Sequence, residues 1–419
     1  MFRKLSVLFL AVLLVFTSAL PVFAADEIPE PFCGDLDEED CELLHASTSA
    51  MFDLGSYTTS VRYSIYQHGL PELPLESEAA VEVLGQYAFD EAARDAIRTL
   101  AVISRQEPLA AVEAIGESPE LLIDLYSGMT ADLAFTLDLS ESWIRTLEDE
   151  ADLEWPELTT VNVRLVDGVL YFDIRELKPL IPELEEVNDW LAIELVRALE
   201  QLAEQGVFAA VAADVAASSQ GRSVWGLDPA MLNLITTMRS AFGRPQVLWP
   251  YMEISRRRDV ELSGQAGAVF RTELDVLGFI LSREFRDVLT QVLQVAAATD
   301  EAEVDQGEIE QIASLFWFLA PSLFRDLEVS GTSTIGLDDL YQHQGRTVFD
   351  WDLTMLIQMV SEFSGEDFGP LADEIFILFT TEFENSAFNE EVTVTAPDDA
   401  QVLPLDAMEM EMEGLREFN

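Results

Sequence analysis

Two cysteines near the N-terminus are the residues whose types and spacing come closest to a chemical site. Cys33 and Cys41, the only cysteines in the sequence, lie eight positions apart in a turn-rich segment. In an oxidising compartment such a pair forms one small disulfide loop, and this is our prediction, with no bound metal. A metal site is the alternative, although this spacing matches no familiar ligand pattern. It would recruit Asp35, Asp37, Glu38, Glu39, Asp40 and His45.

The common signatures of hydrolases and phosphate-binding enzymes are missing from the sequence. The segment Gly331 to Gly336 is one residue too long for the nucleophile elbow of a serine hydrolase. His45, His68 and His343 are scattered, and the local sequence suggests no partner group for any of them, so we expect surface histidines. Lys178, the only lysine after residue 4, does not follow a glycine, which excludes a phosphate-binding loop of the Gly-Lys type. We therefore predict a protein that is not an enzyme and uses no cofactor.

Charged side chains in the sequence have a simpler interpretation than catalysis. Asp350 and Asp352 form one of several carboxylate pairs, and pairs are expected by chance among 78 acidic residues. We interpret such pairs as the solvated face of a strand. The single basic cluster, Arg256, Arg257 and Arg258, is expected to offset nearby acids, with an anionic ligand site as the alternative. Those acids are Glu253, Asp259 and Glu261.

The composition describes a globular protein with an acidic surface. The sequence has 419 residues with 78 acidic and 23 basic side chains, a formal charge of −55. This charge excludes a nucleic-acid binder and a protein that docks on anionic lipid headgroups through a basic patch. Because 49% of the residues are apolar and 10% aromatic, the chain is too hydrophobic to be disordered.

The first 24 residues resemble a secretory signal peptide. Arg3 and Lys4 precede the apolar run 5–20, and Val22 and Ala24 are the small residues that a signal peptidase reads. The run is short for a membrane anchor, so we predict cleavage and an extracytoplasmic protein, whether secreted, periplasmic or at the cell surface, with no transmembrane segment afterwards. No cysteine directly follows the run, which predicts no lipid anchor.

The remaining chain alternates between two hydrophobic periods. Apolar residues at every second position predict strands, and Asp167-Gly168 predicts a tight hairpin turn. The predicted strands are 56–65, 81–89, 129–139, 159–166, 169–174, 190–195, 252–262, 266–275, 323–337, 341–353 and 375–384. Spacings of three and four residues predict helices at 91–104, in two short segments before 128, and at 177–184, 196–218, 229–242, 284–298, 308–318 and 354–363.

The domain organisation follows from these elements. Residues 25–50 are interpreted as an acidic leader that carries the disulfide, 51–405 as a single α+β domain, and 406–419 as an acidic tail, because no linker divides the chain. Residues 269–275 align with 348–354, and 135–140 is a fainter copy. One interpretation is a repeated β-rich unit. The other is that any strand with one face towards a core shows a similar sequence pattern, without a repeat.

Four segments carry a family resemblance. The sequences VRLVDGVLYF at 163–172, WLAIEL at 190–195, and the segments 261–275 and 338–352 resemble hairpins of exported lipid-binding proteins of the LppX/LprG type. The resemblance covers residues 55–395 discontinuously. It implies a LolA/LolB-like fold, a strongly curved antiparallel sheet, or half-barrel, whose concave face is covered by helices.

The resemblance also implies a function. Between sheet and helices such a protein binds a lipid or another hydrophobic ligand, as a carrier or sensor. The sequence lacks the anchor cysteine common in this family, and its long insertions at 196–245 and 284–321 could fill the cavity with protein. The alternative is a structural or interaction module at the cell surface that uses the same fold without a ligand.

Large apolar side chains on the predicted strands are the candidates for a ligand-lining surface, and a dry, fully packed core is the other interpretation. The candidates are Phe135, Leu137, Phe172, Phe270, Leu274, Phe349, Trp351 and Leu353. Acidic neighbours such as Glu273 and Asp350 should then lie on the outer face of the sheet. Loss of Arg3 and Lys4 with the signal changes the formal charge to −57, so we expect adaptation to a salty or acidic exterior and poor folding at low ionic strength.

Overall fold

The structure is a computed structural model. It describes residues 31–70, 74–106, 110–145, 158–179, 181, 184–218, 248–283, 285–286, 289, 314, 317–358 and 373–403. The predicted signal peptide, the helix at 229–242, the tail at 406–419 and nearly all of the helices at 284–298 and 308–318 lie outside these residues.

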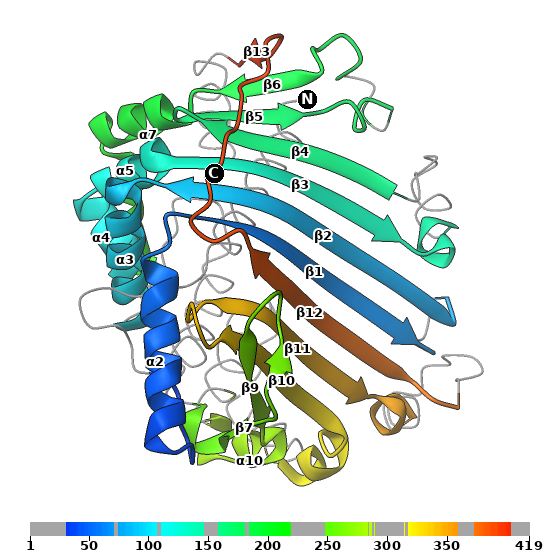
Figure 1. The fold of residues 1–419 in the computed structure, drawn as a ribbon. Coiled ribbons are helices and arrows are strands. Elements are labelled where there is room, and N and C mark those ends of the chain that lie inside the picture. Colours follow the sequence, from blue (N-terminus) through cyan, green and yellow to red (C-terminus); the bar gives the residue numbers. More distant parts are fainter. Residues whose placement is uncertain are drawn as a thin grey trace.

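One open, curved sheet of 13 strands runs through the described part of the chain (Figure 1). Its order is β13-β6-β5-β4-β3-β2-β1-β12-β11-β10-β9-β7, with β8 paired to β9. All pairings are antiparallel except that of β13 with β6. The strands are β1 (Ser56–His68), β2 (Glu76–Phe89), β3 (Met129–Leu139), β4 (Leu158–Val166), β5 (Val169–Asp173), β6 (Trp190–Ile193), β7 (Met252–Arg256), β8 (Val260–Glu261), β9 (Ala266–Leu274), β10 (Leu327–Gly336), β11 (Gln342–Asp352), β12 (Phe376–Ser386) and β13 (Gln401–Val402).

The described α-helices have 5 to 16 residues. They are α2 (Glu38–Phe52), α3 (Glu91–Gln106), α4 (Ala110–Glu117), α5 (Glu120–Gly128), α7 (Leu195–Glu204), α8 (Val207–Ser218), the 3-10 turn η3 (Trp249–Tyr251) and α10 (Val276–Ile280). Residues 141–145, 317–323 and 354–358 are also helical. The predicted α+β class and the open, curved sheet are confirmed.

The register gives the sheet one apolar and one charged face. Leu165, Ala131, Tyr87 and Tyr57 stand opposite one another across β4, β3, β2 and β1, and all four are buried. We call their side of the sheet the apolar face. The adjacent residues of each strand point to the other side, because side chains alternate along a strand. We call that side the charged face; the predicted acidic positions Glu273 and Asp350 lie on it, since their neighbours Leu274 and Phe349 share the apolar face.

Helices cover the apolar face at both ends of the sheet. Buried residues of α3, α5 and α7, among them Ala96, Leu125 and Leu195, join the large core cluster of β1 to β6, and Figure 1 shows these helices gathered at one end of the strands. On β9 and β10, α2 packs against Phe270 and Ala268. Helix α10 packs against the neighbouring apolar positions of the same two strands.

The hairpin turn between β4 and β5 follows from its sequence. Asp167 and Gly168 have φ values of 50° and 73°, so both adopt the left-handed conformation that a primed two-residue turn requires. A Cβ atom on Gly168 would lie 2.6 Å from a methyl group of Val196 at the start of α7. Glycine is therefore needed both for the turn and for the close approach of the helix.

Several predicted elements differ in the structure. Residues 196–218 form two helices, α7 and α8, because the chain turns at Gly206 with φ 69°. The predicted strand 323–337 begins only at Leu327, after the helical residues 317–323. The predicted strand 252–262 is interrupted between Arg256 and Val260. In the predicted helix 177–184, residues 177–179 form turns and Leu184 has a 3-10 conformation.

The acidic leader contains more structure than its composition indicated. Helix α2 crosses the expected boundary between residues 50 and 51, and Leu43 and Leu44 pack against the buried cluster on β9 and β10. Asp37 caps this helix by accepting a hydrogen bond from the backbone N–H of Asp40 at 2.9 Å. The segment after residue 37 therefore belongs to the folded unit.

A C-terminal strap, residues 387–403, crosses the charged face from β12 to β6 (Figure 1). At its start, Asn389 accepts from the backbone N–H of Gly55 at 2.8 Å and donates its own N–H to the carbonyl of Ser56 at 2.8 Å. Further along, Arg164 donates to the carbonyl of Thr395 at 3.2 Å. The strap ends as β13, which covers the edge of the sheet at β6.

Candidate functional site

All the candidate ligand-lining residues lie on the apolar face. Register pairs place Phe135 and Leu137 on β3 and Phe172 on β5 on the same side as Leu133 and Val163. The remaining candidates occupy the corresponding side of β9 and β11 and the residue after β11, namely Phe270, Leu274, Phe349, Trp351 and Leu353. Their shared face is thus a structural fact, whereas contact with a ligand stays a prediction.

Some of these candidates are fixed in the protein core. Phe172, Phe270 and Leu353 are buried. The guanidinium of Arg256 lies 5.2 Å from the ring centroid of Phe270. The Trp351 indole donates to the carbonyl of Leu323 at 3.0 Å. Such contacts give these side chains a packing role.

The open part of the apolar face lies at the middle strands. Ile65 on β1, Val81 on β2 and Phe379 on β12 have exposed fractions of 42%, 36% and 39%. Ile65 stands opposite Phe379, and Phe379 opposite the candidate Phe349. Val81 stands opposite the candidate Leu137 and opposite Tyr63. We call Tyr63, Ile65, Val81, Leu137, Phe349 and Phe379 the apolar window.

Sequence reasoning found only part of this window. Leu137 and Phe349 were candidates, but Ile65, Val81 and Phe379 were not. Alternation predicts which face a residue shares, yet it does not predict where the covering helices end. The extent of the face that helices cover depends on contacts between residues distant in sequence.

Two tyrosines lie deep on the same face. Tyr57 and Tyr87 stand opposite each other on β1 and β2, with ring centroids 5.2 Å apart. Their exposed fractions are 3% and 0%. The ring of Tyr87 lies over Gly85, where a Cβ atom would be 2.9 Å from it. Glycine at this position makes room for the ring.

The hydroxyl groups of both tyrosines are buried without a hydrogen-bond partner among the described residues. Burial raises the pKa of Tyr57 well above its ordinary value, and the nearby Tyr87 adds to this effect. Burial likewise raises the pKa of Tyr87, with a further contribution from Tyr63. A third buried hydroxyl of this kind belongs to Thr159, which stands opposite Leu137 of the window. All these groups are neutral hydrogen-bond donors at physiological pH.

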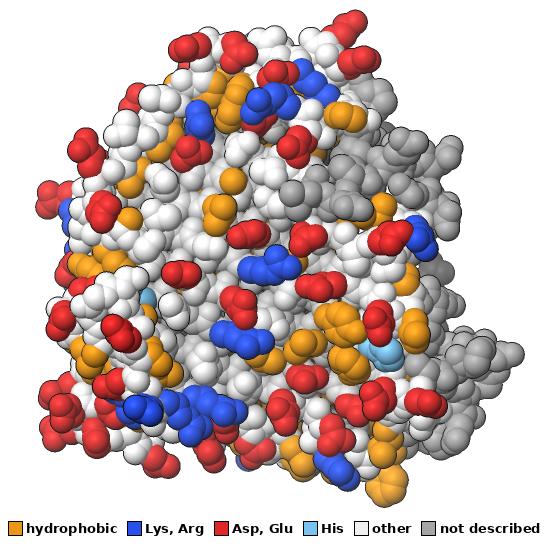
Figure 2. Space-filling view, turned by 45° about the vertical axis from the view of Figure 1, so that its right-hand side comes forward, with side chains coloured by type: hydrophobic (Ala, Val, Ile, Leu, Met, Phe, Trp, Pro, Cys, Tyr) orange, Lys and Arg blue, Asp and Glu red, His pale blue; other side chains and the backbone are white. Residues whose placement is uncertain are grey.

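The charged face carries a shallow hollow of about 430 Å³. Across it runs a row of opposed side chains from β2 to β11, formed by Glu82, Arg62, Glu382 and Arg346. Charges alternate in sign along this row, and Arg346 Nε lies 3.1 Å from Glu382 Oε1. Figure 2 shows acidic and basic side chains interleaved over this face. Opposite charges on neighbouring strands stabilise the sheet modestly.

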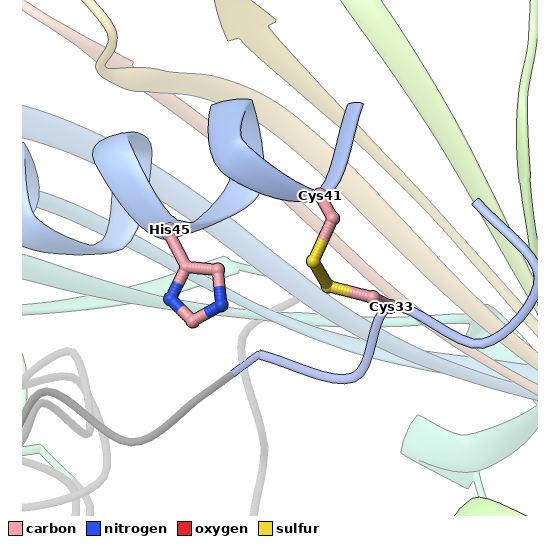
Figure 3. A group of neighbouring side chains, drawn as sticks. All are labelled: Cys33, Cys41 and His45. Carbon is pink, nitrogen blue, oxygen red and sulfur yellow. A yellow bond between two sulfur atoms is a disulfide. The ribbon is translucent and has the colours of Figure 1, made fainter. Parts of the chain in front are cut away.

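Cys33 and Cys41 form a disulfide, as their spacing predicts, with Cα atoms 5.4 Å apart. Figure 3 shows the bond beside His45, and one ligand-type atom of each of the three residues lies within 4.8 Å of the others. Because the two sulfur atoms are bonded to each other, they are not thiolates that could hold a metal. The geometry favours the disulfide over the metal alternative.

His343 has a partner that sequence reasoning missed. Its Nε2 atom lies 2.9 Å from Asp339 Oδ2, and Gln265 also donates to this carboxylate. The three side chains surround the turn between β10 and β11, where Leu340 has a φ of 64°. The spacing of four residues between Asp339 and His343 was the available signal. The group links the turn to β9 and carries no further sign of chemistry.

The remaining charged candidates are a carboxylate pair and an arginine cluster. Asp350 and Asp352 are exposed on the charged face. Arg256 pairs with Asp259, as expected, and also with Asp40 of α2 at 3.1 Å. Arg256 therefore links α2 to the edge strand β7 by an ion pair.

Comparisons with known proteins give distant structural neighbours only. No protein-family model matches the sequence, and no curated protein matches it. The chain is similar to LprF from Mycobacterium bovis, with 10% identity, a TM-score of 0.29, and coverage of 86% of this chain and 98% of that chain. It is also similar to the Mycobacterium tuberculosis lipoprotein LppX, with 9% identity, a TM-score of 0.24, and coverage of 84% and 97%. LppX is one of the proteins that give their name to the family that the sequence resembles, but both superpositions are loose, so the fold is defined here by its own sheet register.

Proposed function

We propose that the protein binds a lipid or another hydrophobic ligand on the apolar face, between sheet and helices, as a carrier or sensor. The observation that carries this proposal is the apolar window. Ile65, Val81 and Phe379 remain exposed on the middle strands of the sheet, whereas α3, α5 and α7 cover the opposite end of β1 to β3 and α10 covers β9 and β10.

The hydrophobic effect supplies the physical reason. Removing apolar surface from water contributes about 25 cal/mol per Å², so adjoining exposed side chains form a favourable surface for an apolar ligand. The window side chains of β1, β2, β3, β11 and β12 are all uncharged. A long hydrocarbon chain fits such a surface better than a polar metabolite does.

The proposed cellular location and the absence of covalent chemistry are inferred from the sequence. We infer an exported protein that binds its ligand without covalent chemistry. Cys33 and Cys41 are the only cysteines, and their disulfide supports the absence of a lipid anchor, since a thioether anchor needs a free thiol. Among the described residues, no helix is long and apolar enough to cross a membrane.

A second candidate function uses the charged face. The hollow there is lined by polar side chains such as Ser60, Gln344 and Glu384, besides Arg62 and Arg346. This observation favours a structural or interaction module at the cell surface, in which the sheet is a scaffold and a polar partner occupies the hollow.

Ligand extraction separates the two functions. The purified protein is extracted with organic solvent and analysed by mass spectrometry, and its affinity for a fluorescent fatty acid is measured. We expect a copurifying lipid and saturable binding. Absence of both would contradict the carrier proposal and leave the charged face as the functional surface.

Matched variants locate the binding surface. Ile65→Ser with Phe379→Ser makes the window polar, and we expect at least about tenfold weaker binding from the lost apolar contact. Leu84→Ser is the control, because Leu84 is at least as exposed, at 49%, but lies on the charged face. Equal losses in both variants would show that the probe binds elsewhere.

A further inference from the structure

Cys33, Cys41 and His45 bring three metal-ligand atoms together from two adjacent segments. Cys41 and His45 are four residues apart on α2, so their side chains lie on the same side of the helix. Cys33 approaches them from the turn that precedes the helix (Figure 3). One ligand-type atom of each residue lies within 4.8 Å of the other two, and all three residues are half-buried.

Helix α2 is held in place by contacts that involve neither sulfur atom. Leu43 and Leu44 pack against the buried cluster on β9 and β10, and Met51 belongs to the large core cluster. Asp40 Oδ1 lies 3.1 Å from a guanidinium nitrogen of Arg256 on β7. We therefore expect Cys41 and His45 to keep their positions when the disulfide is broken.

The segment of Cys33 also has anchors of its own. The ring centroid of Phe32 lies 5.8 Å from that of Trp249. Leu36 packs against the same cluster as α2, and its backbone N–H donates to the carbonyl of Cys33 at 2.9 Å. Reduction would thus leave two thiols close to each other and to the imidazole, because packing fixes both segments.

This set of atoms has the chemistry of a zinc site. Zinc binds cysteine thiolates and histidine nitrogens, and sites with two cysteines, one histidine and a water molecule are known. The disulfide blocks this use, since both sulfur atoms are bonded to each other. The exposed carboxylates of Asp35, Asp37, Glu38 and Glu42 in the same segment add negative charge that favours a bound cation.

We propose that the disulfide blocks a redox-controlled zinc site. When a small dithiol reductant opens the bond, the thiolates of Cys33 and Cys41 and the imidazole of His45 bind Zn²⁺, with water as the fourth ligand. The reductant supplies two electrons and is itself oxidised to a disulfide. The two thiols that form release their protons to solvent as the metal binds. Oxidation reverses these steps and releases the ion.

This inference is independent of the proposed function. The site contains no residue of the apolar window, and it lies on α2 and the turn before it instead of on the sheet. Loss of zinc binding would leave the proposed hydrophobic ligand untouched, and absence of that ligand would leave the zinc site untouched.

The test compares the oxidised and reduced forms of the same purified protein. After the reductant is removed under anaerobic conditions, each form is titrated with Zn²⁺ in competition with a chromophoric chelator. We expect a tight site in the reduced form alone, with release of about two protons per ion at neutral pH, because free thiols are mostly protonated there. Co²⁺ should give thiolate-to-metal charge-transfer absorption in the reduced form. Equal zinc binding by both forms, or no tight binding by the reduced form, would overturn the proposal.

Matched variants test the ligands. In the reduced protein, His45→Ala should weaken zinc binding at least about tenfold. His68→Ala is the control, because His68 lies on β1 beside Glu76, and it should bind zinc like the wild type. The double variant Cys33→Ser with Cys41→Ser should behave like the oxidised wild type. Wild-type affinity in either the His45 variant or the double serine variant would contradict the assigned ligands.

Thermal unfolding gives a readout that does not depend on an optical probe. Zn²⁺ should raise the melting temperature of the reduced wild type, because a ligand that binds the folded state stabilises it. The oxidised wild type and the double serine variant should not respond. An equal rise in all three would assign the effect to surface carboxylates, and a reduced protein that unfolds before zinc is added would refute the packing argument; either result overturns the proposal.

Discussion

The two faces of the sheet are made by the same strands, yet their side chains are held by different forces. On β9, Phe270 is 1% exposed on the apolar face, whereas the neighbouring side chain of Arg271 is 44% exposed on the charged face. Burial stabilises the first face, and weak, solvent-screened ion pairs stabilise the second. The acidic surface and the proposed hydrophobic binding surface are therefore separate features of one sheet, formed by side chains one residue apart.

A substitution on each side of β9 tests this difference most strongly. Phe270→Ala should lower the free energy of unfolding by about 3–5 kcal/mol, because it leaves a cavity in the cluster under α2. Arg271→Ala should cost less than about 1 kcal/mol, since its partner Glu273 is equally exposed. Denaturant unfolding of both variants measures the two costs, and similar values would remove the distinction between the faces.

Two glycines compare a tightly packed position of the apolar face with a more open one. Gly85→Ala should cost about 1–3 kcal/mol, because its Cβ would lie 2.7 Å from Leu133 and would displace the Tyr87 ring. Gly331→Ala on β10 is the control, since the nearest atom, the carbonyl oxygen of Arg346, is 3.7 Å from the Cβ position. Thermal unfolding should separate the two variants. If Gly85→Ala is as mild as the control, the tyrosine ring is placed differently.

Asp173 is buried, unlike most acidic side chains on the charged face. The pH dependence of its contribution to stability tests how strongly its hydrogen bonds hold the carboxylate ionised. Its side chain is 4% exposed and accepts hydrogen bonds from Arg175 and Asn162. Burial opposes ionisation, but these bonds outweigh it and hold the pKa of Asp173 below its ordinary value.

Asp173→Asn should therefore cost about 1–3 kcal/mol at neutral pH. A lowered pKa in the folded state stabilises the protein above the ordinary aspartate value of about 3.9, and this stabilisation is lost as the pH falls through the lower native pKa. The difference between wild type and variant should thus shrink below about pH 4. Asp132→Asn is the control and should show less than about 1 kcal/mol, because the Asp132 carboxylate pairs with Arg164 but is 37% exposed.

The smallest effect is expected in the alternating row of charges. A double-mutant cycle on Arg346→Gln and Glu382→Gln should give a coupling energy below about 1 kcal/mol, since both side chains are about half exposed. The coupling should fall further in molar salt because of screening. A coupling above about 2 kcal/mol that resists salt would mean that the hollow is less solvated than its geometry indicates.

Local pattern was sufficient for many elements of the fold. The alternation in 129–139 predicted β3 to the residue, and Asp167-Gly168 predicted the turn between β4 and β5. In both cases the signal is contained in neighbouring residues. The shared face of Phe135 and Phe270 could be predicted for the same reason, because alternation assigns faces without knowledge of the partner strand.

Features set by distant contacts could not be predicted. The break at Gly206 lies inside a long apolar helical pattern, which continues on both sides of the turn. The packing of α2 on β9 joins segments more than 200 residues apart, so an acidic composition suggested a leader instead. The exposure of Ile65 and Phe379 depends on where the covering helices stop, and the unpaired hydroxyl of Tyr87 becomes visible only when its neighbours are placed.

The seam between β1 and β12 has a consequence for how the protein reaches its folded state. Apart from β13, the sheet consists of two halves that are contiguous in sequence, β1 to β6 and β7 to β12, and β1 joins β12 along a register from Thr58 to His68. During synthesis β1 therefore keeps an unpaired edge until residue 376 and its successors arrive. A free edge strand invites pairing with other chains, and such late, non-local closure is slow. The same seam divides the chain into two segments that could be produced separately and tested for reassembly.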